Sequence, residues 1–246
     1  MTLVEPPVQF LNRPDGTRLA YRHLRGEGPT IVFLPGYMSD MQGGKAQALA
    51  AWAQTQNRAM LRLDYSGCGE SDGEFESGTL DVWRDDVCAV IAAVVTGPII
   101  LVGSSMGGWL MLLVAQALGD QVRALVGIAA APDFTDWDFD AADKAALLDK
   151  GRIERPSDYG YDAMVITQDF WTSGQDNLQL TDRVAIHCPV RLIHGQQDPD
   201  VPWEISLKLA ACLCSADVQT LLIKDGDHRL SRDQDIALLI DVVAKL

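Results

Sequence analysis

The chain has 246 residues, of which 48% are hydrophobic and 22% are charged, a composition typical of a single soluble globular domain. Its formal net charge of −14 repels phosphate backbones, so we expect no nucleic-acid partner. The longest apolar runs, Ala89–Val95 and Trp109–Leu118, are too short to cross a bilayer, so we expect no membrane span.

The first residues and the cysteines bear on the compartment. The N-terminal sequence lacks the basic start, apolar stretch and cleavage site of a signal peptide, and it is not rich in Arg and Ser as a mitochondrial presequence is. The five cysteines are odd in number and form no CxxC pair, which argues against a secreted disulfide framework. We therefore expect a cytoplasmic location.

Short apolar runs alternate with longer helical patterns along the chain. The expected strands are Val8–Leu11, Arg18–Leu24, Thr30–Leu34, Ala59–Leu63, Pro98–Val102, Val122–Ile128, Pro189–Ile193 and Val218–Ile223. The expected helices are Lys45–Gln54, Leu80–Val95, Met106–Leu118, Trp203–Leu213 and Asp233–Lys245. The first two strands, joined by a short turn, favour an antiparallel hairpin. The later alternation favours parallel βαβ units with helices on both faces. The pattern predicts one α/β domain, residues 1–246, with a mostly parallel eight-stranded sheet.

One segment, residues 133–180, interrupts this alternation. It is rich in aromatic residues and shows no strand–helix repeat, although helical pieces are expected at Asp140–Lys150 and Gln168–Ser173. We interpret it as a lid insertion over the catalytic face, because its aromatic side chains must be buried against something. A plain surface excursion is the alternative.

The pentapeptide Gly103-Ser104-Ser105-Met106-Gly107 matches G-x-S-x-G, a pattern that alone occurs by chance. Here it follows an apolar strand and opens a helical run, which is the strand–turn–helix setting that a nucleophilic serine requires. Such a turn exposes the Ser105 hydroxyl at the carboxyl edge of the sheet. We predict that Ser105 is a nucleophile rather than part of an ordinary Gly/Ser turn.

A nucleophilic serine needs a base and an acid that orients the base. Of the four histidines, His228 lies between the last strand and the last helix, where open α/β sheets place their sites. The loop after Pro189–Ile193 offers two carboxylates, Asp198 and Asp200. We prefer Asp198, which comes three residues after the glycine that ends the strand. His194 is expected to serve local packing.

The substrate side of the site is predicted by position. The backbone N–H groups of Met106 and Tyr37 are expected to form the oxyanion hole, with Gly36 letting the backbone approach. Met38, Trp137, Phe170 and Trp171 are candidates for the walls of an apolar acyl pocket. The alternative is that these side chains only pack the core beneath the site.

These residues resemble the α/β-hydrolase family. Asp64–Asp72 is similar to the family's D-x-x-G-x-G-x-S signature, and Leu101–Met111, Leu34–Tyr37, Val201–Trp203 and Asp227–Arg229 resemble a subgroup described as palmitoyl-protein thioesterases and acyl-glucuronide esterases. The similarity extends from about Leu19 to the C-terminus and is weakest in the lid. Pro35 stands where many members carry the histidine of an HG motif. The chain looks like a bacterial or cytoplasmic counterpart of this subgroup.

The resemblance and the residues together predict a serine hydrolase for carboxylic esters or thioesters, with medium or long acyl groups preferred. The substrate would be a small ester or thioester or an S-acylated protein. Water is the second nucleophile, so no cofactor or metal is implied. A cofactor-free perhydrolase or an acyltransferase on the same triad is the alternative, and a non-catalytic binding protein is a third hypothesis.

Overall fold

The computed structural model describes residues 5–156 and 163–246. Its main sheet has eight strands in the order β1-β2-β4-β3-β5-β6-β9-β10. These strands are β1 (Gln9–Asn12), β2 (Arg18–Leu24), β3 (Glu27–Leu34), β4 (Arg58–Leu63), β5 (Ile99–Ser104), β6 (Val122–Ile128), β9 (Val190–Gly195) and β10 (Val218–Ile223). All eight expected strands occur, and the sheet is parallel from β4 to β10.

The N-terminal hairpin β1–β2 is antiparallel, as the sequence predicts, and β2 also pairs antiparallel with β4. The parallel strands are apolar on both faces, so helices must cover both. The helices packed on the sheet are α1 (Gly44–Thr55), α2 (Leu80–Val94), α3 (Met106–Leu118), α7 (Glu204–Cys212) and α8 (Asp233–Ala244). Short 3₁₀ turns lie at Phe75–Ser77 and Gly119–Gln121.

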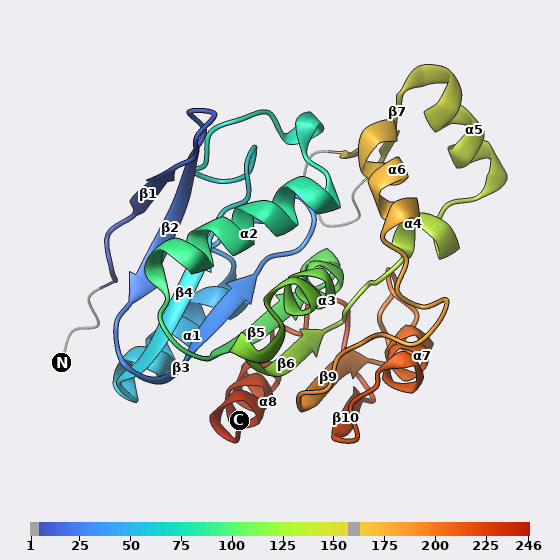
Figure 1. The fold of residues 1–246 in the computed structure, drawn as a ribbon. Helices are drawn as coiled ribbons and strands as arrows, with labels where there is room; N and C mark the ends of the chain where they lie inside the picture. Colours follow the sequence, from blue (N-terminus) through green and yellow to red (C-terminus); the bar gives the residue numbers. More distant parts are fainter. Residues whose placement is uncertain (1–4, 157–162) are drawn as a thin grey trace.

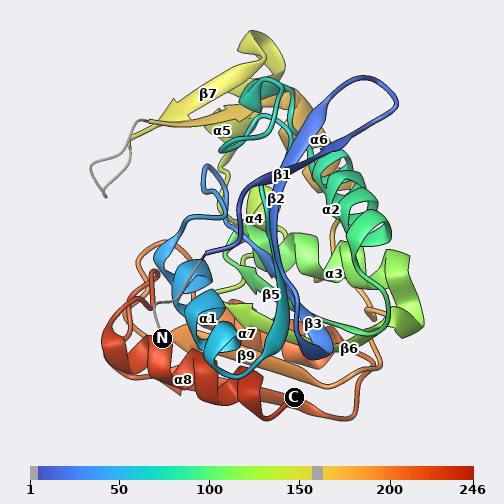
Figure 2. The same cartoon turned by 90° about the vertical axis from the view of Figure 1, so that its left-hand side faces the viewer.

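Figure 2 shows α1 and α8 on one side of the sheet and α2 and α3 on the other. Two hydrophobic clusters correspond to these two faces. The smaller contains Leu49 of α1 and Val243 of α8, together with Val102 and Val126 of the sheet. The larger lies under α2, α3 and α7 and extends into the lid. The sheet is therefore held rigidly from both sides, which fixes where its strands end.

The segment expected to be a lid begins after β6. It contains α4 (Phe134–Trp137), α5 (Ala141–Lys150), an antiparallel hairpin of β7 (Arg152–Arg155) and β8 (Met164–Thr167), and α6 (Gln168–Asp176). Figure 1 shows α4, α5, α6 and β7 gathered at one end of the molecule, apart from the main sheet. The sequence did not predict the hairpin or α4, because four-residue elements carry too few residues for a clear period. Tyr159 and Tyr161, which contributed to the lid prediction, lie outside the described residues.

The base of this segment is tied together by Asp133. Its Oδ1 accepts a hydrogen bond from the backbone N–H of Gln179 and its Oδ2 one from Leu180, each at 2.7 Å. Burial raises the pKa of the Asp133 carboxyl, and these two hydrogen bonds oppose that rise. One buried side chain therefore joins the first and last residues of the insertion.

Candidate active site

Ser105 lies at a strained turn between β5 and α3. Its backbone has φ 55° and ψ −123°, an uncommon conformation for a residue with a Cβ that stores strain at functional sites. The surrounding structure holds it there: the N–H of Ser105 donates to the carbonyl of Ile128 at 2.9 Å, and its own carbonyl accepts from Gly108 at 2.8 Å. The hydroxyl consequently stands at the carboxyl end of β5.

The two glycines of the pentapeptide are required by close backbone approach. A Cβ on Gly103 would lie 2.3 Å from the carbonyl oxygen of Gly107, and one on Gly107 would lie 2.2 Å from the carbonyl oxygen of Leu34. Neither space can be opened by rotating a side chain, because the obstacles are backbone atoms. The sequence pattern thus reports a real steric requirement of this turn.

His228 reaches the serine from the loop after β10. Its Nε2 is 3.1 Å from Ser105 Oγ, and its Nδ1 is 2.8 Å from Asp198 Oδ2. The imidazole is 16% exposed, so the ring has an open side while both nitrogens are engaged. Of the other histidines, His23 lies in β2, where burial lowers its pKa, and His187 is exposed in the loop before β9.

Asp198 and not Asp200 makes the hydrogen bond to the ring. The Asp198 side chain is fully buried, and its Oδ1 accepts from the backbone N–H groups of Asp200 and Val201 at 2.9 and 2.8 Å. Burial raises the pKa of this carboxyl, but the hydrogen bonds from His194 and His228 lower it by more, so the net pKa is well below the ordinary value. Asp198 is therefore ionised at neutral pH.

His194 also contacts this carboxylate, which sequence reasoning missed. It was expected to pack locally, whereas its Nε2 lies 3.2 Å from Asp198 Oδ2 in a fully buried position. The signal that could have found it is its place at the carboxyl end of β9, four residues before Asp198. His194 therefore packs in the core, as expected, and in addition contacts the carboxylate of Asp198.

The loop after β3 lies against the serine. A Cβ on Gly36 would be 3.3 Å from Ser105 Cβ and 3.9 Å from its Oγ, so the backbone here runs directly beside the hydroxyl. The Tyr65 hydroxyl donates to the carbonyl of Pro35 at 2.9 Å and fixes the loop from below. Met106 opens α3, and amides in the first turn of a helix have no intrahelical acceptor. Both backbone segments expected to supply oxyanion donors therefore border Ser105.

The residues expected to form an acyl pocket have different surroundings. Met38 is 43% exposed beside the Gly36 loop. Trp137 and Trp171 are half-buried, and their indole N–H groups donate to the carbonyls of Pro132 and Thr135. Phe170 is only 1% exposed, so its ring offers almost no surface to a substrate.

Tyr37 connects the serine loop to the lid. Its hydroxyl donates to the carbonyl of Val165 in β8 at 2.7 Å, and its ring packs on Phe75, Phe134 and Phe170 with centroids 4.7 to 6.2 Å apart. Burial raises the pKa of the Tyr37 phenol far above its usual range, so the hydroxyl remains a donor. The segment expected to be a lid therefore packs directly on the loop beside Ser105.

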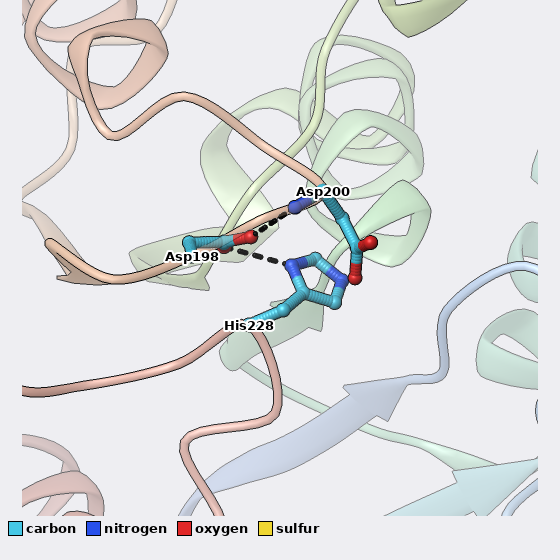
Figure 3. A group of neighbouring side chains, drawn as sticks. All are labelled: Asp198, Asp200 and His228. Carbon is cyan, nitrogen blue, oxygen red and sulfur yellow. Dashed lines mark hydrogen bonds and ion pairs between the residues drawn. The ribbon is translucent and has the colours of Figure 1, made fainter. Parts of the chain in front are cut away.

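Asp198, Asp200 and His228 are the group of potential metal ligands in the described part of the chain, with ligand atoms within 4.8 Å of one another (Figure 3). Both Asp198 oxygens already accept two hydrogen bonds each. A cation would have to displace the donors of Asp198 and separate it from the ring. The donor set thus fits a hydrogen-bonded carboxylate better than a metal ligand.

Comparison with known proteins identifies the family of this chain. A model described as "Alpha/beta hydrolase family" matches residues 31–242, which includes the serine, the aspartate and the histidine. This chain belongs to the α/β-hydrolase family. The expected fold class is confirmed by this match and by the eight-stranded, mostly parallel sheet.

This α/β-hydrolase is similar to mammalian proteins that share the name ABHD10. It is 41% identical over 247 residues to "Palmitoyl-protein thioesterase ABHD10, mitochondrial" of Homo sapiens, covering 97% of this chain and 81% of the relative. It superposes on a structure of alpha/beta hydrolase domain-containing protein 10 from mouse with a TM-score of 0.91 and 40% identity, covering 97% of each chain. Est1E from Butyrivibrio proteoclasticus, solved with ferulic acid, shares the fold at 22% identity and a TM-score of 0.77, covering 96% of each chain.

The cytoplasmic expectation is wrong by this comparison. The relatives of this name from Homo sapiens, Pongo abelii and Bos taurus are all named as mitochondrial. The expectation relied on the pattern of the first residues, which is weak evidence because leader segments are removed from mature proteins. Among the described helices, none is both long and apolar enough to span a membrane.

Proposed function

We propose that this α/β-hydrolase cleaves carboxylic ester or thioester bonds through an acyl-enzyme intermediate on Ser105. The observation that carries the proposal is the continuous hydrogen-bonded path from Asp198 through His228 to the Ser105 hydroxyl, with distances of 2.8 and 3.1 Å. A path of this kind lets a neutral hydroxyl lose its proton as it attacks.

The first half of the reaction forms the acyl-enzyme. The Ser105 oxygen attacks the carbonyl carbon of the substrate while His228 Nε2 takes the hydroxyl proton. Asp198 keeps the proton of His228 on Nδ1 and stabilises the imidazolium that results. The carbonyl π electrons move to oxygen, and the N–H groups of Met106 and Tyr37 stabilise this oxyanion. Collapse breaks the bond to the leaving alcohol or thiol, which takes the proton from Nε2.

The second half repeats these steps with water. His228 Nε2 removes a proton from the water, whose oxygen attacks the acyl carbon bound to Ser105. The tetrahedral intermediate then releases the carboxylic acid, and the proton returns to Ser105 Oγ. No electron acceptor is needed, because the net change is hydrolysis.

We propose that the acyl group is medium or long. Two observations support this: the ABHD10 relatives are named palmitoyl-protein thioesterases, and apolar side chains lie near the Gly36 loop. Met38 is exposed there, and Trp137 and Trp171 are half-buried in the lid. Burial of a methylene contributes about 0.8 kcal/mol, which corresponds to about fourfold in kcat/KM per added carbon while the pocket has room.

Two other kinds of function are alternatives to hydrolysis for a chain with these residues. A perhydrolase or an acyltransferase would form the same acyl-enzyme and transfer the acyl group to a nucleophile other than water. A non-catalytic binding protein would have no need for the hydrogen bonds among Ser105, His228 and Asp198. We favour hydrolysis, because it needs no second substrate site beside His228.

A substrate panel tests the proposal. Esters of p-nitrophenol with acyl chains of increasing length, acyl-CoA thioesters and S-acylated peptides would be compared for wild type and Ser105→Ala. We expect Ser105→Ala to lose on the order of 10⁶-fold in kcat and to resist labelling by a fluorophosphonate probe that labels wild type. Equal labelling of both proteins would refute the role of Ser105, and an optimum at acetyl would refute the long-acyl part alone.

A further inference from the structure

His194 lies at the end of β9 in a fully buried position with three polar contacts. Its Nε2 is 3.2 Å from Asp198 Oδ2 and 3.1 Å from the carbonyl oxygen of Val201, and its Nδ1 is 2.7 Å from the Ser206 hydroxyl. An imidazole placed only to fill the core would not need three partners, since a leucine fills a similar volume without polar atoms.

These contacts determine which nitrogen carries the proton. Both neighbours of Nε2 are acceptors, an ionised carboxylate and a backbone carbonyl, so Nε2 must carry the hydrogen. The neighbour of Nδ1 is a hydroxyl, which can donate, so Nδ1 is an acceptor. In this arrangement each nitrogen of the His194 ring has a hydrogen-bond partner.

We propose that His194 is a positioning residue for the reaction, holding the Asp198 carboxylate in place and sharing its negative charge. This inference rests on the proposed function of Asp198 and His228. His194 donates to the same Oδ2 that accepts from His228 Nδ1. Ser206, His194, Asp198, His228 and Ser105 thus form one hydrogen-bonded chain that ends at the nucleophile.

The position of His194 has an electrostatic consequence. A hydrogen bond donated to a carboxylate draws negative charge away from its second partner. With His194 in place, Asp198 attracts the Nδ1 proton of His228 less strongly, so loss of the His194 donor should change the pH dependence of the rate. Asp200 also lies near the His228 ring, with its carboxylate within 4.8 Å of a ring nitrogen, and Asp227 and Arg229 flank His228 in sequence. All three are the same in wild type and in the variants of His194.

The backbone contacts of Asp198 do not replace this donor. The N–H groups of Asp200 and Val201 both bind Oδ1, and they leave Oδ2 to the two histidines. Without His194, Oδ2 would keep a single hydrogen bond in a fully buried place. The carboxylate would be both more basic and freer to rotate about its Cβ–Cγ bond.

A matched pair of substitutions tests the proposal. His194→Gln places an amide N–H at a similar distance from Cα as Nε2, and His194→Met has a similar length without a donor. We expect His194→Met to lose about 10- to 100-fold in kcat, the range for groups that orient a catalytic ligand. We also expect the acid limb of its kcat/KM profile to move up by about 0.5 to 1 pH unit. His194→Gln should keep the acid limb of wild type and most of its rate.

Several outcomes would overturn the inference. Equal losses in the two variants with an unmoved acid limb would mean that His194 only packs, and wild-type behaviour of His194→Met would mean that it does nothing for Asp198. If thermal unfolding shows that His194→Met does not fold, Ser206→Ala is the second variant. Removing that hydroxyl weakens the donor strength of His194 and should move the acid limb in the same direction by less, and an unmoved limb would refute the proposal.

Failure of the proposed function and failure of the role of His194 give different results. If Ser105→Ala retains activity, the proposed function is wrong, and so is the role of His194 that rests on it. If Ser105→Ala is inactive while His194→Met has the rate and acid limb of wild type, only the role of His194 is wrong.

Discussion

Replacing Asp198 by asparagine tests how the carboxylate of the proposed triad controls the position of the His228 proton, because the substitution removes the charge and changes the shape of the side chain very little. The side chain is fully buried and has four hydrogen-bond donors around it, two on each oxygen. The backbone N–H groups of Asp200 and Val201 cannot become acceptors, so the amide oxygen of asparagine must stay with them. The amide NH₂ then faces His228 and His194.

The NH₂ group reverses the hydrogen bond to His228. It donates to Nδ1, which must give up its hydrogen, and the ring proton moves to Nε2. Nε2 lies 3.1 Å from Ser105 Oγ, and a protonated nitrogen cannot accept the serine proton. His194 can adapt, since its proton can move to Nδ1 and be donated to the Ser206 hydroxyl, although this removes its hydrogen bond to the carbonyl of Val201. The fold is therefore expected to survive while the base is lost.

The expected loss is about 10⁴-fold in kcat, the size found when a triad histidine takes the wrong tautomer, which corresponds to about 5.4 kcal/mol of transition-state stabilisation. The assay is hydrolysis of a p-nitrophenyl ester at neutral pH, with circular dichroism to confirm folding. Asp200→Asn is the matched control, because its side chain is exposed and only its backbone N–H contacts Asp198. A folded Asp198→Asn within tenfold of wild type, or an Asp200→Asn that is the more damaged of the two, would refute the reasoning.

Three further predictions concern stability and the turn at the serine. The folded-state pKa of Asp198 is depressed below its ordinary value of 3.8, so its ionised form contributes stability above about pH 4 that is lost as the pH falls further. Urea unfolding between about pH 6 and pH 3 should therefore show a steeper loss of unfolding free energy for wild type than for Asp198→Asn. Parallel curves for the two proteins would contradict this. Asp133→Ala should lower the free energy of unfolding by about 2 to 4 kcal/mol, because it leaves the buried N–H of Leu180 and the part-buried N–H of Gln179 without acceptors. Asp136→Ala, at an exposed site of the same segment, should change it little. Equal effects would mean that Asp133 does not hold the base of this segment together. Gly107→Ala should yield no active soluble enzyme, since its Cβ would lie 2.2 Å from a backbone oxygen. The control Gly44→Ala should behave as wild type, because its Cβ would meet nothing within 4 Å. A fully active Gly107→Ala would contradict the steric explanation.

Much of the fold follows from local patterns. The eight strands and the five helices that cover the sheet were predicted within a few residues of their observed bounds, because buried parallel strands and long helices each carry a strong periodic signal. The lid hairpin and α4 were not predicted, since elements of four residues have too little period to read. The G-x-S-x-G pattern around Ser105 was also recognisable in the sequence. The backbone of Gly107 approaches the end of β3 so closely that only glycine fits there.

The loops at the strand ends required the tertiary structure. Sequence order placed an aspartate and a histidine after the serine, and the distance from the glycine at the strand end favoured Asp198 over Asp200, which are two residues apart in one loop. That choice depends on which carboxylate turns inward toward His228, and the backbone turn through Asp200 and Val201 decides it. Likewise, Phe170 was proposed as a pocket candidate from its position in the expected lid, and only its packing on Tyr37 and Phe134 shows that it is enclosed.

The sequence by itself therefore determined the type of sheet, the strand–turn–helix around Ser105 and the short list of residues at the carboxyl edge. Those features depend on residues that are near each other along the chain. The tertiary structure decided the pairing of Asp198 with His228, the contact of His194 with the same carboxylate, and the seating of the lid on Tyr37. The Asp198–His228 and Tyr37–Val165 contacts join residues 30 and 128 positions apart in sequence, whereas His194 and Asp198 are four positions apart and meet because of the turn that follows β9. These distances depend on how the chain folds back on itself, which hydrophobic periodicity does not encode.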